Sequence, residues 1–334
     1  MPRFGVVVPS FGAFAEPSVD AEITRVVESL GYESLWYGDH VVVPTYAAHL
    51  LPADWLDPIA HCLVGLGRTT TLRFGTEVLV APYRNPVLTA KLLATGDVLG
   101  GGRLTPAFGV GYLRGEFEAL DAPDFDARGA VTDEYLSVIR ELWSSEGPIS
   151  HSGPHVELRD VHFGPAPVQD QMPIWVGGNG PAALRRAALL GTGWHPLFPT
   201  PEQYSSGRRR IEELRADHDR SDPFTFSYSC GVTKLLDSED GPYVTGSWAD
   251  LDDVPDDFDY APPMPADDAG RPFFMGTPDQ VAADIDLHRR AGVEHFVLRF
   301  ATGGPETTPQ QMLDQLERFA RDVVPRAARE SAST

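Results

Sequence analysis

The sequence predicts an α/β protein whose fold is a (β/α)8 TIM barrel with insertions. Short apolar runs of strand length alternate with amphipathic stretches of helix length along all 334 residues. This alternation is typical of repeated βα units and a parallel sheet. Eight such units suit a closed barrel of about 250 residues, with room for insertions, better than an open doubly wound sheet. We expect a single barrel domain over residues 1–334.

The eight expected strands are short apolar runs, and an expected helix follows each of them. The strands cover residues 3–9, 33–37, 72–79, 104–110, 174–177, 193–197, 224–233 and 295–300. The helices cover residues 19–30, 58–66, 86–99, 131–143, 181–190, 201–218, 278–291 and 309–323. Several helices begin with proline, which suits the first turn because the N–H that proline lacks has no partner there. Thr277 and Thr308 precede two of these prolines and can cap the helices with their hydroxyl groups.

Two segments interrupt the repeat and are expected insertions. Residues 144–170 are rich in His, Pro and Gly, and residues 155–158 and 161–163 within them could pair as a small hairpin. Residues 238–272 are acidic and Pro-rich, with no Lys or Arg before Arg271. Segments of this kind are either solvated loops or functional lids.

Composition restricts the class of partner. The chain has 27 Lys+Arg against 48 Asp+Glu, a net charge of −21, so nucleic acid and anionic membrane surfaces are poor partners. We find no apolar run near the roughly 18 residues that a membrane span requires. Cys62 and Cys230 are too few for a disulfide framework. We expect a cytoplasmic protein that acts on a small molecule.

Residues that could carry chemistry are sought at the carboxyl ends of the strands, because barrel active sites lie there. These ends are rich in Gly, aromatic, His and acidic residues. The candidates are Ser10, Asp39, His40, Thr76, Glu77, Val78, Gly111, Tyr112, Gly177, Gly178, Asn179, Trp194 and His195.

The strongest signal is a possible phosphate site where the fifth strand breaks into glycines. Gly177-Gly178-Asn179-Gly180 precedes a helix that opens at Pro181, and N–H groups at a helix start favour anions. The run spells a loose GxGxxA, but the acid of a dinucleotide-binding fold is missing about 20 residues on, so we set that fold aside. An ordinary turn between strand and helix is the alternative.

His40 could exchange protons at the barrel mouth, because imidazole titrates near neutral pH. A histidine that only caps its own loop is the alternative, and His195 has the same ambiguity. Aromatic residues near the strand ends could form a flat slot for a planar ring, although such residues are more often core. They are Phe11, Trp36, Tyr112, Trp175 and Trp194.

Metal and serine chemistry have weaker support. His151, His155 and His162 lie near one another in the first insertion, but no HExxH or Cys/His finger spacing accompanies them. A GxSxG nucleophile elbow is also missing from the sequence. We expect no metal site.

Several segments together resemble the luciferase-like monooxygenase superfamily, and within it the branch of oxidoreductases that depend on the deazaflavin coenzyme F420. The segments are residues 31–40, 81–91, 97–104, 109–120, 177–186 and 193–196. The resemblance implies a bacterial luciferase-like barrel enzyme with insertions, usually a homodimer. It also implies a flavin or deazaflavin across the carboxyl-end mouth of the barrel.

The resemblance further implies roles for single residues. It places Asp39 and His40 beside the ring system, with His40 as the proton-transfer group. The stretch 76–78 corresponds to a bulge behind the ring that often contains a non-proline cis peptide, here Glu77-Val78. Gly177, Gly178 and Asn179 would hold the cofactor phosphate, and Trp194 and His195 would lie alongside.

The sequence departs from the sugar-phosphate dehydrogenases of the family. Pro44 stands where those members have a Trp, and Arg114 aligns with their Glu after the fourth strand. Glucose 6-phosphate is therefore a disfavoured substrate. An anionic cofactor tail would need local basic residues, for which Arg84, Arg114, Arg185 and Arg186 are candidates.

The hypothesis is hydride transfer between F420 and a small organic substrate, with His40 donating or accepting the accompanying proton. A monooxygenase that uses FMN and oxygen is the first alternative. A barrel protein that binds a ligand without turnover is the second, because fold does not fix function.

Overall fold

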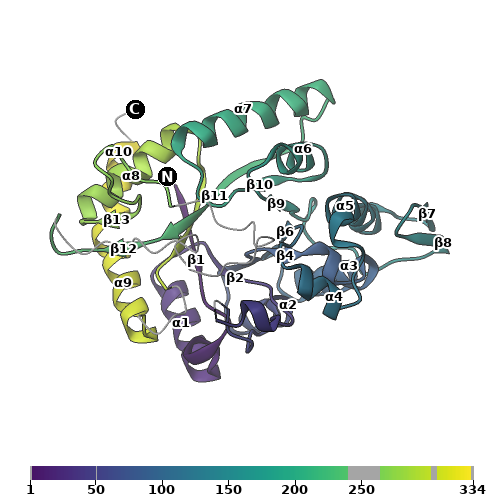
Figure 1. The fold of residues 1–334 in the computed structure, drawn as a ribbon, viewed down its shortest axis with the longest axis horizontal. Coiled ribbons are helices and arrows are strands. Elements are labelled where there is room, and N and C mark those ends of the chain that lie inside the picture. Colours follow the sequence, from purple (N-terminus) through teal and green to yellow (C-terminus); the bar gives the residue numbers. More distant parts are fainter. Residues whose placement is uncertain (1, 50, 240–263, 302–306, 332–334) are drawn as a thin grey trace.

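The computed structural model describes residues 2–49, 51–239, 264–301 and 307–331. A closed parallel barrel forms its centre, and helices surround the strands (Figure 1). The wall strands are β1 (Arg3–Val7), β2 (Ser34–Tyr37), β3 (Arg73–Thr76), β4 (Leu79–Val80), β5 (Leu104–Thr105), β6 (Ala107–Gly109), β9 (Trp175–Gly177), β10 (Gly193–His195), β11 (Thr225–Val232) and β14 (His295–Arg299). The predicted (β/α)8 barrel is confirmed.

Two of the eight predicted strands are each divided in two. Residues 72–79 form β3 and β4, and residues 104–110 form β5 and β6. β3 pairs with β5 while β4 pairs with β6, and these pairings close the sheet. Pro106 separates β5 from β6, and the Thr76 hydroxyl bridges the break: it accepts from Ala107 N–H at 2.9 Å and donates to Ala107 C=O at 2.6 Å.

All eight predicted helices are present, with ends within three residues of those expected. The helices are α1 (Pro17–Ser29), α2 (Pro58–Arg68), α3 (Pro86–Leu99), α4 (Arg114–Ala119), α5 (Arg128–Ser144), α6 (Pro181–Leu190), α7 (Pro201–Asp217), α8 (Pro278–Arg290), α9 (Pro309–Asp322) and α10 (Val324–Ser331). Thr277 and Thr308 cap α8 and α9 through capping boxes with Gln280 and Gln311. None of the helices in the described part of the chain is both long and apolar enough to cross a membrane.

The first insertion does contain a hairpin, but its expected strands are wrong. β7 (Ile149–Ser152) pairs antiparallel with β8 (Glu157–Val161), and Figure 1 shows the hairpin projecting from the side of the barrel near α5. Gly153 N–H donates to Val156 C=O at 3.0 Å, which closes the turn where a strand was expected to begin. The Gly-Pro step at 153–154 is a turn signal, and it outweighs the apolar residues after it.

Most of the acidic insertion lies outside the described residues, because residues 240–263 are not described. Its last part is held by Arg271, which donates to both carboxylate oxygens of Asp284 at 2.7 and 2.8 Å. Arg271 also donates to Asp267 at 2.9 Å. Two short strands, β12 (Lys234–Leu235) and β13 (Met275–Gly276), pair with each other outside the barrel.

Two tryptophans fill the barrel interior, and glycines make room for them. The rings of Trp36 and Trp175 stack with centroids 5.2 Å apart. A Cβ on Gly75 would lie 2.4 Å from Trp36, and a Cβ on Gly193 would lie 2.4 Å from Trp175. Trp36 has no exposed surface, so both rings are core and do not line a slot for a planar ligand. Large residues thus face glycines on neighbouring strands, as close packing requires.

We predict that Gly75→Ala destabilises the protein by about 1–3 kcal/mol, because the added methyl group overpacks the barrel against Trp36. The measurement is urea unfolding followed by tryptophan fluorescence. Gly67→Ala is the matched control, since Gly67 lies in α2 and its Cβ would meet nothing within 4 Å. Equal stability of the two variants would contradict this account of the core.

Candidate active site

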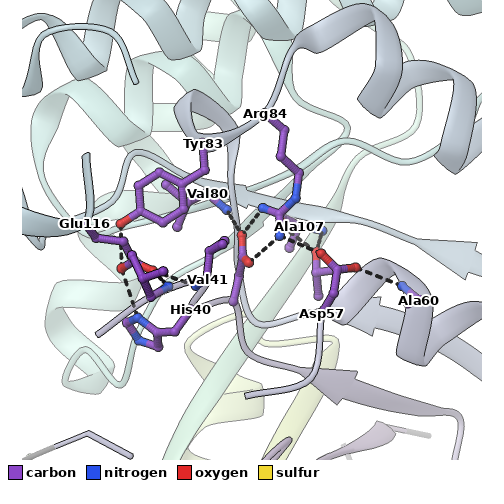
Figure 2. A network of polar contacts seen from close by, with 12 residues as sticks. His40, Val41, Asp57, Ala60, Val80, Tyr83, Arg84, Ala107 and Glu116 are labelled. Carbon is purple, nitrogen blue, oxygen red and sulfur yellow. Dashed lines mark hydrogen bonds and ion pairs between the residues drawn. The ribbon is translucent and has the colours of Figure 1, made fainter. Parts of the chain in front are cut away.

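A buried carboxylate organises the loops at the carboxyl ends of the strands (Figure 2). Glu116 of α4 has a fully buried side chain. Its Oε1 accepts from the N–H groups of Val41 and Val42 at 2.6 and 3.3 Å. Its Oε2 accepts from the Tyr83 hydroxyl at 2.8 Å and lies 3.1 Å from His40 Nδ1. Glu116 therefore connects the loop after β2 with the loop after β4.

The opposite ring nitrogen of His40 contacts a second tyrosine. His40 Nε2 lies 3.0 Å from the Tyr112 hydroxyl. The Trp55 ring packs against the imidazole, with centroids 4.8 Å apart, and Phe11 packs on Trp55. The His40 side chain is only 10% exposed, and Tyr112 is also partly buried. His40 and Tyr112, both predicted site residues, thus lie together at the mouth.

Asp39 anchors the same region through an arginine. Arg84 donates to both Asp39 oxygens at 2.6 and 2.7 Å, and Val80 N–H donates to Asp39 at 2.8 Å. Arg84 also donates to Asp57, which caps α2, at 2.8 Å. Burial alone would lower the pKa of Arg84, but the two carboxylates raise it above its ordinary value. The Asp39 carboxylate is thus occupied in holding the loops.

The expected bulge lies between β3 and β4. The Glu77-Val78 peptide is cis, as the resemblance implies. A Cβ on Gly109 would lie 2.4 Å from the Val78 side chain, and a Cβ on Gly177 would lie 3.1 Å from it. The missing side chains on β6 and β9 therefore leave space for Val78.

Glu77 and His195 form a buried pair beneath the bulge. Glu77 Oε2 lies 2.5 Å from His195 Nε2, and Glu77 Oε1 accepts from the Ser229 hydroxyl and lies 3.3 Å from Arg299. His195 is 2% exposed and stacks on Trp36 with centroids 5.0 Å apart. Burial raises the pKa of Glu77, but His195, Arg299 and Ser229 outweigh it, so the net shift is downward. Both residues thus form part of the barrel interior.

The expected phosphate loop is tied to the loop after β10 by the Asn179 side chain. The Asn179 amide donates to Leu197 C=O at 2.8 Å and accepts from Leu197 N–H at 3.0 Å. Asn179 therefore ties two loops together, and its side chain is not free for a phosphate. Gly178 has φ +106, and a Cβ there would lie 2.9 Å from Ala183. Gly180 caps α6 without a side chain, which leaves the first-turn N–H groups with no side-chain acceptor.

Three other expected cofactor contacts have structural roles in this chain. Trp194 is buried against Tyr204 of α7, on the helix side of the barrel, and its expected place alongside the ring stays a prediction. The Thr76 hydroxyl is engaged by Ala107 in both directions. Gly111 has φ +80, and a Cβ there would lie 2.8 Å from Phe117. Side chains alternate across a strand, so His195 points inward and Trp194 outward.

The expected basic residues are mostly neutralised. Arg84 pairs with acids as described, Arg114 pairs with Asp126 at 2.8 Å, and Arg186 is buried on Asp133. Arg185 is exposed and forms no ion pair within the described ranges.

Sequence reasoning missed Glu116 because it placed Arg114 at the acidic position of this loop. Arg114 lies over the Phe125 ring at 4.4 Å, whereas Glu116, two residues later, reaches His40. An acid soon after a barrel strand is the signal that could have identified it.

Two buried polar side-chain atoms in the loops after β1 and β2 have no hydrogen-bond partner among the residues that the structure describes. Ser10 Oγ and Trp55 Nε1 have no hydrogen-bond partner in the described part of the chain. Buried polar atoms are normally satisfied, so atoms of this kind indicate a missing ligand or water. Among the described residues, we find no group of three His, Cys, Asp or Glu side chains that could hold a metal ion.

A closed parallel barrel with buried acids and a histidine at its carboxyl-end mouth is the architecture of a barrel enzyme. The chain belongs to the luciferase-like monooxygenase family, because the model of that family matches residues 4–240.

Two curated relatives carry specific activities. The chain is 25% identical to an F420-dependent glucose-6-phosphate dehydrogenase of Amycolatopsis mediterranei, over 90% of this chain and 91% of the relative. It is 29% identical to a phthiodiolone/phenolphthiodiolone dimycocerosates ketoreductase of Mycobacterium tuberculosis, over 67% of this chain and 63% of the relative. The match thus spans less than two thirds of the ketoreductase.

Solved structures share the fold. An F420-dependent secondary alcohol dehydrogenase in complex with an F420-acetone adduct has a TM-score of 0.77 at 20% identity, over 98% of this chain and 99% of that one. The coenzyme F420 dependent tetrahydromethanopterin reductase from Methanopyrus kandleri has a TM-score of 0.72 at 19% identity, over 97% and 99%.

We predict that Glu77→Gln destabilises the protein by about 3–5 kcal/mol at neutral pH, because it removes the buried carboxylate that forms an ion pair with Arg299. The folded pKa of Glu77 is below its unfolded value, so its stabilising effect is present above about pH 4.3 and is lost as the pH falls below that. Denaturant midpoints from pH 7 to 3 test this, and the gap between wild type and variant should narrow.

The matched control is Glu157→Gln, since Glu157 forms an exposed pair with Arg159. Its unfolding midpoint should equal that of the wild type. A Glu77→Gln gap that stays constant from pH 7 to 3 would mean that the carboxylate charge is not what stabilises the site.

Proposed function

We propose that this oxidoreductase depends on F420 and transfers a hydride between the deazaflavin and a small organic substrate. His40 is the proton donor or acceptor. The observation that carries the proposal is the His40 imidazole at the barrel mouth, held by the buried Glu116 carboxylate at 3.1 Å and contacting Tyr112 at 3.0 Å. General acid–base catalysis requires such an oriented group close to the reacting atoms.

The described residues fit a flavin or deazaflavin. Ser10 Oγ and Trp55 Nε1, which have no hydrogen-bond partner among the described residues, would bond to the ring, and the bulge at Val78 would support it. Backbone N–H groups at the start of α6, beside Gly177 and Gly178, would hold the phosphate, since helix N-termini favour anions. When bound, the deazaflavin supplies the carbon that carries the hydride, and the protein supplies orientation and protons.

The relatives favour a deazaflavin and an oxygen-bearing substrate. The names of the glucose-6-phosphate dehydrogenase, of the solved alcohol dehydrogenase and of the solved tetrahydromethanopterin reductase all include F420. A dehydrogenase of a sugar, a dehydrogenase of an alcohol and a ketoreductase all interconvert hydroxyl and carbonyl groups. We therefore propose an alcohol or carbonyl compound as the substrate class.

An FMN-dependent monooxygenase is the second candidate. The family description names monooxygenases, and the monooxygenase RslO1 from Streptomyces bottropensis shares the fold with a TM-score of 0.74 at 22% identity. Both cofactors have a planar tricyclic ring and a phosphate, so the same mouth suits either.

We predict micromolar binding of F420 and much weaker binding of FMN. The measurement is equilibrium titration of the purified protein with each compound, followed by quenching of cofactor fluorescence. Tight binding of FMN alone would replace the proposal by the monooxygenase. Binding of neither would favour a barrel protein that holds another ligand without redox chemistry.

We also propose that the protein is a homodimer joined through α2 and α3, which pack side by side. These two helices expose Val64, Leu88, Leu92 and Leu99, and Leu99 is 80% exposed. Contiguous exposed apolar side chains mark association surfaces.

We predict that the double variant Leu88→Glu, Leu92→Glu is monomeric by light scattering after gel filtration. Each chain would bring two new carboxylates to the contact, so the dimer would have to bury four like charges. Leu287→Glu on α8 is the control, since Leu287 is 43% exposed but lies on another helix, and it should remain dimeric. A monomeric wild type, or a dimer unaffected by the double variant, would contradict this interface.

A further inference from the structure

We propose that the Tyr112 phenol passes the proton between the substrate oxygen and His40, which remains the proton acceptor or donor of the proposed function, with Glu116 behind His40. The inference deepens the proposed function and rests on it for the hydride acceptor. It assigns a catalytic role to Tyr112 and a positioning role to Glu116.

The contacts of Glu116 fix where the proton of His40 lies. Backbone N–H groups can only donate, so Val41 and Val42 make Oε1 an acceptor. Burial and the nearby Glu116 carboxylate raise the pKa of Tyr83 far above its ordinary value, so the Tyr83 hydroxyl keeps its proton and donates to Oε2. With donors on both of its oxygens, Glu116 is left to accept from His40 as well. His40 Nδ1 therefore carries the proton that bonds to Glu116.

With the proton on Nδ1, Nε2 is left to accept the second hydrogen bond. Tyr112 lies 3.0 Å from Nε2, so its O–H donates to this nitrogen. The relay runs from the Tyr112 oxygen through both nitrogens of one imidazole to the Glu116 carboxylate. A carboxylate on the far side of a histidine fixes the tautomer and stabilises the imidazolium that forms during proton transfer.

The packing around His40 favours contact of the substrate with Tyr112. Trp55 covers one side of the imidazole, and Tyr112 lies edge-on at 5.7 Å between centroids, so the His40 side chain is only 10% exposed. Both ring nitrogens of His40 are engaged, Nδ1 by Glu116 and Nε2 by Tyr112. A substrate oxygen therefore reaches this hydrogen-bond chain through the Tyr112 phenol.

The step balances in the direction of alcohol oxidation. The substrate O–H bond breaks and its proton passes to the Tyr112 oxygen, while the Tyr112 proton passes to His40 Nε2. The C–H bond at the carbon that carries this oxygen also breaks. The hydrogen leaves with both electrons, as a hydride, to the 5-deazaflavin of the proposed function. The product is a carbonyl compound, and the imidazolium is paired with Glu116. Carbonyl reduction is the reverse.

The hydrogen-bond chain is tested first without cofactor or substrate. In protein labelled with ¹⁵N-histidine, NMR should show His40 as the Nδ1–H tautomer with an Nε2 that accepts a hydrogen bond. Tyr112→Phe should shift the Nε2 resonance and leave Nδ1 protonated. Tyr46→Phe is the matched control, because Tyr46 bonds to Gly115 N–H at 3.1 Å in the same region, and it should shift neither.

An Nε2–H tautomer in the wild type, or an Nε2 resonance that Tyr112→Phe does not move, would overturn the relay. Neither result depends on F420, so either can occur while the proposed function stands.

The catalytic role is tested with F420 and with the probe substrates 2-propanol and glucose 6-phosphate. Tyr112→Phe should bind F420 within about twofold of wild type but lose roughly 10²- to 10⁴-fold in kcat on the probe that is turned over. The double variant with His40→Ala should be no worse than the poorer single variant, because residues that act as a unit are not additive. Tyr46→Phe should keep kcat within about twofold.

The outcomes separate the two proposals. Wild-type protein that does not bind F420 contradicts the proposed function, and the NMR result then decides the hydrogen-bond chain. Wild-type kcat in Tyr112→Phe overturns the catalytic role of Tyr112 and leaves F420 dependence intact. If neither probe is turned over, the NMR result alone decides the relay.

Discussion

The buried carboxylate of Glu116 is the constraint on which the barrel mouth depends. It accepts hydrogen bonds from Val41 and Val42 N–H in the loop after β2 and from the Tyr83 hydroxyl in the loop after β4. It also contacts Nδ1 of His40. A buried acceptor with these donors is satisfied, whereas its loss would leave four donors unpaired at considerable cost. The position of His40 thus follows from a residue far away in the sequence.

Other acids at the mouth are arranged on the same principle. Asp39 is held by Arg84 and Val80 N–H, and Glu77 is held by His195 and Ser229. Burying a charge is costly unless it is paired, so each carboxylate carries its own donors into the interior. The polar groups are therefore oriented before any ligand arrives, as electrostatic preorganisation requires.

Features with a local signal in the sequence were the ones that could be predicted. The helices begin at Pro and Thr signals, and the barrel follows from the alternation of strand and helix lengths. Proton transfer at His40 remains a prediction that the geometry supports. The contacts of Trp194 with Tyr204 and of Asn179 with Leu197 were not foreseen, because strand side chains alternate in direction and because Leu197 lies in another loop. The cofactor roles of Trp194 and Asn179 stay predictions. Glu116 was missed for a related reason: its contact with His40 spans 76 positions.

The central claim is that a planar redox ring lies at this mouth, supported by Val78 and facing His40 and Tyr112. A crystal structure of the protein with bound F420 tests it most directly. We expect the ring against Val78, with the Tyr112 hydroxyl near its reacting carbon and the phosphate at the start of α6. Density for F420 at any other place on the barrel, with the mouth empty, would contradict the account.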